Sequence, residues 1–457
     1  MAIVDGDPDT AWEAPMAEHA LALDLGRVRE FGGLRLRWND GRQASRYSVE
    51  LSDDGGRWRA VRDVRDGNGG DDWRALPESE ARYIRIELQQ GPGRRFALAE
   101  AEVLPLAFSA HPNDVIKAMA AKAPKGQFPR GFSGEQPYWT ILGIDGGDQQ
   151  GLIGEDGAVE VARGGCSLEP FVLVDGRLVS WADVTPVQSL DQGYLPMPQV
   201  QWTRDDLDLR INAFASGNRR ESQLVVRYRL TNPGPATGDY TLALVAQPFQ
   251  VNPPSQFLNT IGGVSRIDAL SIKSGTLSVA GVPRVFSKQV PTSAFATTFD
   301  AGMAVSHLAG SPAGGSGQTG SGQTGPGRDA QWPTTTSVED PTGLASGALL
   351  YQMRLRGWES REISVMVPMT GRPVLAQRWW DAGLLQQTTA ETWQHSLDKV
   401  RFSVPPQGQA LVDTLRTSTA HMLISRIGPR LQPGTRSYSR SWIRDGAMIS
   451  EGLLRMG

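Results

Sequence analysis

The chain has 457 residues, of which 39% are hydrophobic and 21% charged, and its formal net charge is −3. This length allows two or three domains, each with its own hydrophobic core. The charge balance excludes the strongly basic surface that follows nucleic-acid phosphates, so we expect no nucleic-acid partner.

Cysteine and histidine are scarce. Cys166 is the only cysteine, so no internal disulfide can form, and we expect it to be a small buried side chain. The histidines are scattered, with none at metal-ligand spacing, which argues against a zinc site. No apolar run reaches the roughly 18–20 residues of a membrane span, and no signal peptide is visible.

Residues 1–107 alternate apolar and polar side chains with the period of a β-strand. In LRLRW, residues 34–38, the side chains of Leu34, Leu36 and Trp38 fall on one face. YSVEL at 47–51 and YIRIEL at 83–88 alternate in the same way. Turn signals such as DDGG at 53–56 and DGNGGDD at 66–72 separate these segments. Short alternating strands with such turns predict a β-sandwich.

Five segments of this region occur in a recognisable order: DGDPDTAW (5–12), LDLG (23–26), YSVELSDDGGRW (47–58), RYIRIEL (82–88) and LAEAEV (98–103). They resemble the discoidin-like (coagulation-factor C-type) sandwich, which is also used as a carbohydrate-binding module. The resemblance implies a glycan, lipid or protein ligand. The family usually has a strand before its DG motif, and only residues 1–4 precede it here, so the first strand is expected to be missing.

The same resemblance implies a structural Ca²⁺ held by the DGDPDT loop and a glutamate near the end of the module. Residue by residue this points to Asp7, Thr10 and Glu100, with Glu100 preferred over Glu102. Hard oxygen ligands of this kind suit calcium. The alternative is an aspartate-rich turn that holds no metal.

The tryptophans of the module divide into two groups. Trp12, Trp38 and Trp58 follow the strand and motif pattern, and we expect them in the core. Trp73 comes after the glycine- and aspartate-rich turn. It is therefore the better candidate for an exposed platform on which a sugar ring stacks.

A second and larger β region follows. Residues 108–130 read as a connector with a short helix, and 131–373 contain strand patterns at 207–211, 224–230, 240–245 and 362–367. Residues 309–327 repeat GSGQT in tandem, which predicts a disordered surface loop. Glu135, Tyr138 and Trp139 lie in a segment rich in glycine and aromatic residues near the start of this region. They are candidates to line a ligand site, although a turn-rich strand start explains them equally well.

After Pro373 the pattern becomes helical. Residues 374–405 read as a helical linker, and 407–427 as a helix with Leu411, Leu415 and Met422 along one face. Gly428 and the proline after it end that helix, and a second begins near 443. Residues 406–457 are therefore expected to form a helical hairpin.

A sandwich followed by a helical linker and a hairpin resembles the six-hairpin (α/α)-barrel glycosidases of the glucoamylase type and the related disaccharide phosphorylases. YWT at 138–140 and SWIRDG at 441–446 carry the resemblance, and the second meets the Trp-x-Arg-Asp pattern of the glucoamylases. The fold it implies is mainly β: a discoidin-like sandwich, a larger β-supersandwich, a helical linker and the start of an (α/α) barrel. Because only one hairpin of the barrel is present, the chain is expected to be a fragment.

The resemblance assigns the terminal sugar unit to Arg444 and Asp445, with the apolar face of Trp442 beside it. A carboxylate accepts hydrogen bonds from vicinal sugar hydroxyls, and a guanidinium donates to the same hydroxyls. Glu451 lies about 120° around a helix from Asp445, so the two carboxylates do not share a pocket. The catalytic carboxylates are therefore unknown. The alternative reading of Asp445 is an ordinary acidic residue at a helix N-terminus.

These patterns predict the N-terminal portion of a carbohydrate-active enzyme, an exo-acting glycoside hydrolase of glucoamylase type with a glycan-binding module. The alternatives are an enzyme like the disaccharide phosphorylases and a non-catalytic glycan-binding or adhesion protein. The expected partner is an oligo- or polysaccharide, and the expected cofactor is structural Ca²⁺. The module type suggests an extracellular or periplasmic location.

Overall fold

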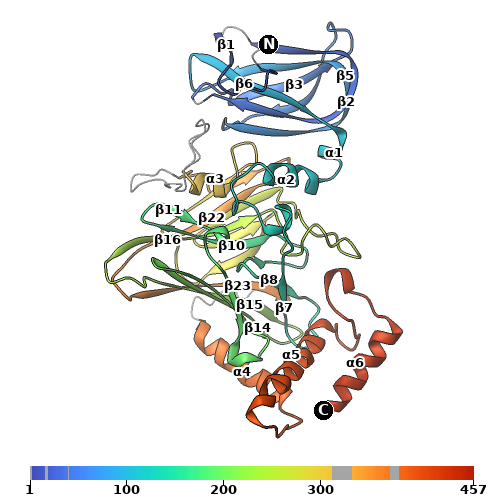
Figure 1. Cartoon of the computed structure of the whole chain (residues 1–457), viewed down its shortest axis with the longest axis vertical. Helices are drawn as coiled ribbons and strands as arrows, with labels where there is room; N and C mark the ends of the chain where they lie inside the picture. Colours follow the sequence, from blue (N-terminus) through green and yellow to red (C-terminus); the bar gives the residue numbers. More distant parts are fainter. Residues whose placement is uncertain (1–2, 16–18, 40, 311–331, 371–379) are drawn as a thin grey trace. The chain divides into compact units, whose positions relative to one another are not determined.

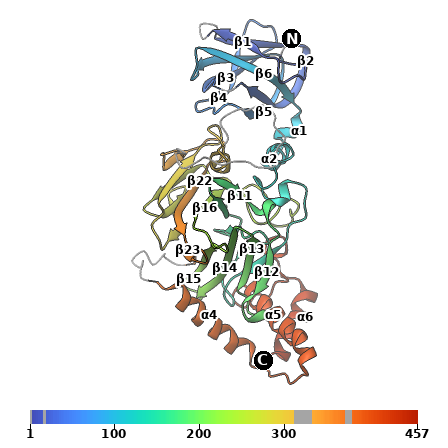
Figure 2. The ribbon, with the colours of Figure 1, turned by 60° about the vertical axis from the view of Figure 1, so that its left-hand side comes forward.

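Strands dominate both parts of the chain (Figures 1 and 2). The computed structural model describes residues 3–15, 19–39, 41–310, 332–370 and 380–457. These residues divide into two compact units. The first unit takes the described parts of Met1–Phe128 and Thr297–Trp332, and the second those of Pro129–Ala296 and Pro333–Gly457. The predicted loop at 309–327 lies almost wholly outside the described residues.

The first unit is built on one six-stranded antiparallel sheet in the order β1-β6-β2-β5-β3-β4. Its two long strands, β2 and β5, pair along most of their length with register shifts near Asp24/Arg29 and Phe31/Gly33. Such irregularities bend a strand, so each long strand contributes to both layers of a sandwich. The elements are β1 (Trp12–Pro15), β2 (Ala20–Trp38), β3 (Arg46–Ser52), β4 (Arg59–Val64), β5 (Asp71–Gln90), β6 (Arg95–Leu104), α1 (Leu106–Ser109), α2 (Pro112–Ala120) and α3 (Ala304–Leu308).

The alternation seen in the sequence sets the core of this unit. Leu34, Leu36 and Trp38 are buried together, as predicted, and the inward residues of β3 and β5 join them. The prediction for Trp58 is wrong. It lies half-buried in the turn before β4 and is not part of the core cluster.

The second unit contains two large antiparallel sheets that face each other across the main core. One sheet runs β20-β22-β16-β10-β9-β8-β7, with β11 paired to β10, and the other runs β12-β13-β14-β15-β23-β19-β18-β17-β21. The first comprises β7 (Trp139–Leu142), β8 (Gly151–Gly154), β9 (Val159–Glu160), β10 (Ser167–Val174), β11 (Arg177–Val179), β16 (Gly238–Gln247), β20 (Ser293–Thr297) and β22 (Ser346–Leu355). The second comprises β12 (Val187–Leu190), β13 (Pro198–Arg204), β14 (Leu207–Gly217), β15 (Ser222–Thr231), β17 (Ala269–Lys273), β18 (Thr276–Val279), β19 (Val282–Ser287), β21 (Ser337–Glu339) and β23 (Ser360–Thr370). Cys166 is buried in this core, as expected.

In the described part of the second unit there are three α-helices: α4 (Ala382–Leu397), α5 (Gln409–Ser425) and α6 (Ile443–Arg455). Short 3₁₀ turns occur at Arg130–Phe132, Trp181–Asp183, Asp191–Gly193, Pro406–Gly408 and Arg436–Tyr438. On β14 and β15 successive side chains point to opposite faces. Ala213 and Leu224 face the main core, whereas Phe214 and Val225 pack with Trp393 of α4 and residues of α5. The helices therefore cover part of the outer face of the nine-stranded sheet (Figure 1).

The sequence prediction of which face of α5 is buried needs correction. Leu411 and Leu415 were expected along the apolar face of their helix, but they are 72% and 47% exposed. The residues of α5 that pack inward are instead Val412, Thr419, Ala420, Ile424 and Ser425. The buried face contains small and hydroxyl side chains, so hydrophobicity alone pointed to the wrong side.

The sequence boundaries of the second sandwich also change. Residues 131–373 were assigned to it as a whole, yet the described residues 297–310 belong to the first unit. Asp300 explains this, because its carboxylate accepts two hydrogen bonds of 2.9 Å from Arg62 of β4 and lies 3.2 Å from Arg74 of β5. Among the described residues, no helix is long and apolar enough to cross a membrane.

Candidate functional site

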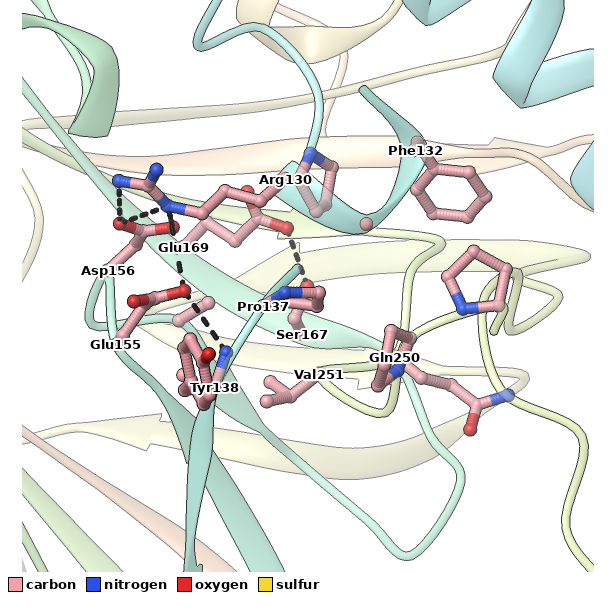
Figure 3. Close-up of a pocket in the computed structure, with 16 residues that line it drawn as sticks. Arg130, Phe132, Pro137, Tyr138, Glu155, Asp156, Ser167, Glu169, Gln250 and Val251 are labelled. Atoms are coloured by element: carbon pink, nitrogen blue, oxygen red, sulfur yellow. Dashed lines mark hydrogen bonds and ion pairs between the residues drawn. The ribbon is translucent and has the colours of Figure 1, made fainter. Parts of the chain in front are cut away.

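A small pocket in the second unit contains Tyr138, one of the predicted site residues (Figure 3). Arg130 and Asp156 face each other at its side, joined by hydrogen bonds of 2.8–3.0 Å, and Arg130 also binds Glu135 at 2.8 Å. The guanidinium stacks over the Trp181 ring at 4.1 Å. Burial raises the pKa of Asp156, and the charge of Arg130 opposes that rise. Arg130 is thus fully engaged by protein groups.

Glu169 is the most perturbed carboxyl group of this pocket. It is fully enclosed, and burial raises its pKa to about 7. Both carboxyl oxygens accept hydrogen bonds of 2.8 Å, one from Ser167 Oγ and one from Gln247 Nε2. The pocket measures about 50 Å³, well below the roughly 300–1,000 Å³ of small-molecule sites. Glu169 is therefore a buried, hydrogen-bonded carboxyl group of β10, and we assign it no catalytic role.

Tyr138 and Trp139 do not act as a pair. Tyr138 is 67% exposed, and its backbone N–H donates to Glu155 Oε1 at 3.0 Å. Trp139, the next residue, is half-buried and packs on the apolar cluster beneath α4 and α5. Tyr138 directly precedes β7, which begins at Trp139, and the two rings have different surroundings. Tyr138 remains an accessible aromatic surface, whereas most of Trp139 supports the helices.

The motif SWIRDG lies at the start of α6. Trp442 occupies the N-cap position, is 37% exposed and meets Tyr438 edge-on at 6.0 Å. Arg444 is exposed and Asp445 half-buried, and neither makes an ion pair or side-chain hydrogen bond with a described residue. The three side chains share one helix end and leave their polar groups available. No ring contact or hydrogen bond among the described residues joins them to Tyr138 or Trp139.

A buried ion pair fixes the segment that leads into α6. Arg436 and Glu160 lie 2.7 Å apart with both side chains fully buried, and Arg436 also donates to the carbonyl of Gln150 at 3.0 Å. Arg436 has a φ of 57°, a left-handed conformation that non-glycine residues adopt at a cost. The ion pair with Glu160 and the hydrogen bond to Gln150 hold Arg436 in this left-handed backbone conformation. The start of α6 is therefore positioned by β9, an interior strand of the eight-stranded sheet.

In the first unit, the DGDPDT loop folds around the carboxylate of Asp5. Asp5 accepts hydrogen bonds from the backbone N–H of Asp7 at 3.0 Å and from Thr10 Oγ1 at 2.9 Å. These hydrogen bonds lower the pKa of Asp5. The Asp5 carboxylate organises the loop, although no sequence pattern singled out this residue.

Glu100 lies beside this loop. Trp12 pairs with Leu98 in the antiparallel β1-β6 ladder, so the same register continued by two residues places Thr10 opposite Glu100. The Oε1 atom of Glu100 is buried and has no hydrogen-bond partner. Among the described residues, no three His, Cys, Asp or Glu side chains converge on a metal position. A cation here would rely on the Thr10 hydroxyl and backbone carbonyls as well as carboxylates.

The expected aromatic platform at Trp73 is wrong. Trp73 is 7% exposed, because Phe108 of α1 stacks on it at 6.0 Å and the guanidinium of Arg35 covers it at 4.8 Å. Arg35 is its direct cross-strand partner on β2. The turn before Trp73 is polar, but the side chain itself points under α1.

Trp58 is more accessible than Trp73, although a guanidinium lies beside its ring as well. It is half-buried outside the core, and the guanidinium of Arg85 lies 4.3 Å from its ring. Arg85 and Glu50 are cross-strand partners on the outward face of the sheet, and their side chains form an ion pair. Tyr83, two residues before Arg85, lies on the same face. An aromatic ring flanked by charged donors and acceptors is an arrangement that suits a sugar.

Residues 1–101 match the F5/8 type C domain. Among solved structures, the chain is similar to chitosan-binding module 2 of a chitosanase/glucanase from Paenibacillus sp. IK-5, in complex with chitotriose (24% identity, 22% of this chain and 83% of that chain covered, TM-score 0.21). It is also similar to the CBM32-5 module of Clostridium perfringens, in complex with GalNAc-β-1,3-galactose (20% identity, 22% and 81% covered, TM-score 0.21). No curated protein matches the chain.

The F5/8 type C domain therefore provides two candidate sites in the first unit. One is the outward sheet face around Trp58 and Arg85, and the other is the loop of Asp5, Asp7 and Thr10 beside Glu100. The match ends at residue 101 and covers none of the second unit.

Proposed function

We propose that this protein binds glycans through its F5/8 type C domain and is part of a carbohydrate-active enzyme. The match of residues 1–101 to that domain is the observation that carries the proposal. The discoidin-like family includes carbohydrate-binding modules, and the outward sheet face has the side chains that glycan binding requires.

The proposed glycan surface is centred on Trp58. Its indole offers an apolar face for the C–H side of a sugar ring, while Arg85 donates and Glu50 accepts hydrogen bonds to sugar hydroxyls. Because Arg85 and Glu50 already hold each other, they are preorganised, and binding costs little side-chain ordering. Tyr83 extends the same face.

We further propose that the F5/8 type C domain holds a structural Ca²⁺. Asp7, Thr10 and Glu100 supply the hard oxygen atoms that this ion prefers. The buried and unpartnered Glu100 Oε1 fits this role, since a buried carboxylate oxygen without a donor is otherwise costly. The ion would neutralise that oxygen and fix the N-terminal loop against β6.

For the second unit, we propose an exo-acting glycosidase of glucoamylase type as the parent enzyme. Two facing sheets followed by α4 and a helical pair agree with that architecture, and Trp442, Arg444 and Asp445 are the proposed subsite for the terminal sugar unit. The availability of Arg444 and Asp445 supports this role. Tyr138 is a further proposed sugar contact, and an extracellular or periplasmic location follows from the substrate.

The alternative functions are a disaccharide phosphorylase and a non-catalytic glycan-binding or adhesion protein. Assays of the complete parent protein on α-glucosides, with and without inorganic phosphate, separate them. A hydrolase releases free sugar without phosphate, a phosphorylase releases sugar phosphate only when phosphate is present, and a pure binder releases neither.

A glycan array tests the binding function directly. The full chain is applied in Ca²⁺ to a panel that includes chitotriose and GalNAc-β-1,3-galactose. We expect selective retention of at least one glycan class, weakened in Trp58→Ala. Absence of binding to every glycan, by a chain shown to be folded, would overturn the proposal.

A further inference from the structure

A second pocket lies in the second unit, where the β14-β15 hairpin approaches α4. Its volume is about 360 Å³, within the roughly 300–1,000 Å³ range of small-molecule sites. The strand side contributes Ser216, Asn218 and Arg219, and the helix side contributes a row of hydroxyl residues. The two walls are distant in sequence, which is why the sequence analysis did not find the site.

The hydroxyl row follows the helical period. Thr388, Thr392 and Ser396 are spaced four residues apart, so they lie on one face of α4. Each hydroxyl donates to a backbone carbonyl one turn earlier, at 2.8–3.0 Å. Their protons are therefore used within the helix, and their oxygen lone pairs remain available to accept hydrogen bonds from a ligand.

Hydrogen-bond donors line the same pocket. Trp393 lines the pocket and is only 5% exposed, yet its indole N–H has no acceptor among the described residues. The Nε1 atom itself is not buried, so its N–H reaches solvent and is available to donate to a ligand. The Ser216 hydroxyl is also unengaged by described residues. Asn218 uses its amide oxygen to cap the hairpin turn, which leaves its NH₂ group available.

The pocket wall is held in place from behind. Asp145 forms a two-pronged ion pair with Arg426 at 2.7 and 2.8 Å, and the adjoining Gly146 N–H donates to the carbonyl of Leu423 at 2.9 Å. Arg219, the one basic side chain of the lining, lies over this loop with its Nε 3.4 Å from the Asp145 carbonyl. The nearby Asp145 carboxylate weakens the attraction of this wall for a free anion.

We infer that this pocket binds a neutral polyhydroxylated ligand, a single pyranose unit of a glycan. Hydroxyl groups both donate and accept, which matches a pocket lined by free oxygen lone pairs and by free N–H and O–H donors. Ile144 and the ring of Trp393 line the pocket and supply the apolar surface that the C–H face of a pyranose requires. The site is separate from the Trp442 end of α6 and from the F5/8 type C domain.

The test uses the full chain labelled with ¹⁵N in its tryptophan indoles. The Trp393 signal is assigned with Trp393→Phe, and the protein is titrated with glucose, galactose, N-acetylglucosamine and, separately, inorganic phosphate. We expect one sugar to shift the Trp393 signal and phosphate to leave it unchanged. The shift should persist in Trp58→Ala, which separates this pocket from the domain site.

Two matched variants decide the location. Thr392→Leu removes a pocket acceptor and fills the space, and it is expected to weaken the sugar titration at least tenfold. Thr414→Leu makes the same change on α5, where Thr414 is exposed and donates to Ala410 O at 2.8 Å, and it should leave the titration unchanged. The inference is overturned if no sugar shifts the signal, if phosphate alone does, or if Thr392→Leu responds like the wild type.

Discussion

Arg436 and Glu160 form an ion pair of 2.7 Å in which both side chains are fully buried. Arg436 belongs to the segment before α6, and Glu160 to β9 at the middle of the eight-stranded sheet. Burial raises the pKa of Glu160, and the adjacent guanidinium opposes that rise. This pair links the Trp442 motif to the sheet, so any change in it should reach the proposed sugar subsite.

Glu160→Ala is therefore expected to be strongly destabilising. Removing one partner leaves the Arg436 charge buried and unpaired, which typically costs about 3–5 kcal/mol. Urea unfolding, followed by near-ultraviolet circular dichroism, measures the loss. The control is Glu451→Ala, which breaks the exposed pair with Arg455 and should change stability by less than about 1 kcal/mol. Equal losses in the two variants would contradict the role of the buried pair.

Glu169 predicts a pH dependence of stability. Its pKa of about 7 in the folded protein exceeds the ordinary glutamate value of 4.5, so the folded state retains a proton that the unfolded state releases. Its stabilising contribution is full below about pH 4.5 and is lost as pH rises to about 7, by an amount on the order of 3 kcal/mol.

Unfolding free energies of the wild type and Glu169→Gln, measured from pH 5 to 8, check this. Glutamine has no proton to lose, so the variant should gain stability relative to the wild type as pH rises. A difference that is constant across this range would show that the Glu169 carboxyl group titrates normally.

Asp300 is expected to hold residues 297–310 on the F5/8 type C domain. It pairs with Arg62 and Arg74, whereas Arg74 keeps Asp72 at 2.8 Å as its second partner. Asp300→Ala should therefore loosen the segment without unfolding the domain, because hydrogen bonds to charged groups contribute about 1.5–3 kcal/mol. Hydrogen exchange should accelerate at 297–310 and stay slow in β2 and β5. Unchanged exchange at 297–310 would show that other contacts hold the segment.

Calcium binding gives a fourth prediction. Excess Ca²⁺ should raise the melting temperature of the F5/8 type C domain within the full chain, since a ligand at about a hundred times its Kd adds about 2.7 kcal/mol. Glu100→Gln should abolish most of the rise, and Glu102→Gln, which is exposed on the same strand, should retain it. Identical melting temperatures in Ca²⁺ and in chelator would show that the domain holds no structural Ca²⁺.

The sequence predicted the strands of the F5/8 type C domain well, because alternation over Leu34, Leu36 and Trp38 reports burial directly. It failed for Trp73, whose exposure depends on α1 folding back over β5. It failed again for residues 297–310, which Asp300 ties to a unit that precedes them by more than a hundred residues. Local patterns carry no information about such long-range packing, and the pocket between the β14-β15 hairpin and α4 was missed for the same reason.

The central claim is that the F5/8 type C domain binds a glycan on the face around Trp58. Isothermal titration of the full chain with the glycan found on the array tests it most directly, using Trp58→Ala and, as a matched control, Trp358→Ala. Trp358 is 70% exposed in the turn between β22 and β23. Loss of a stacking tryptophan typically costs 2 kcal/mol or more, so we predict about a thirtyfold weaker Kd for Trp58→Ala and an unchanged Kd for Trp358→Ala. The same Kd for all three proteins would contradict the assignment of this face.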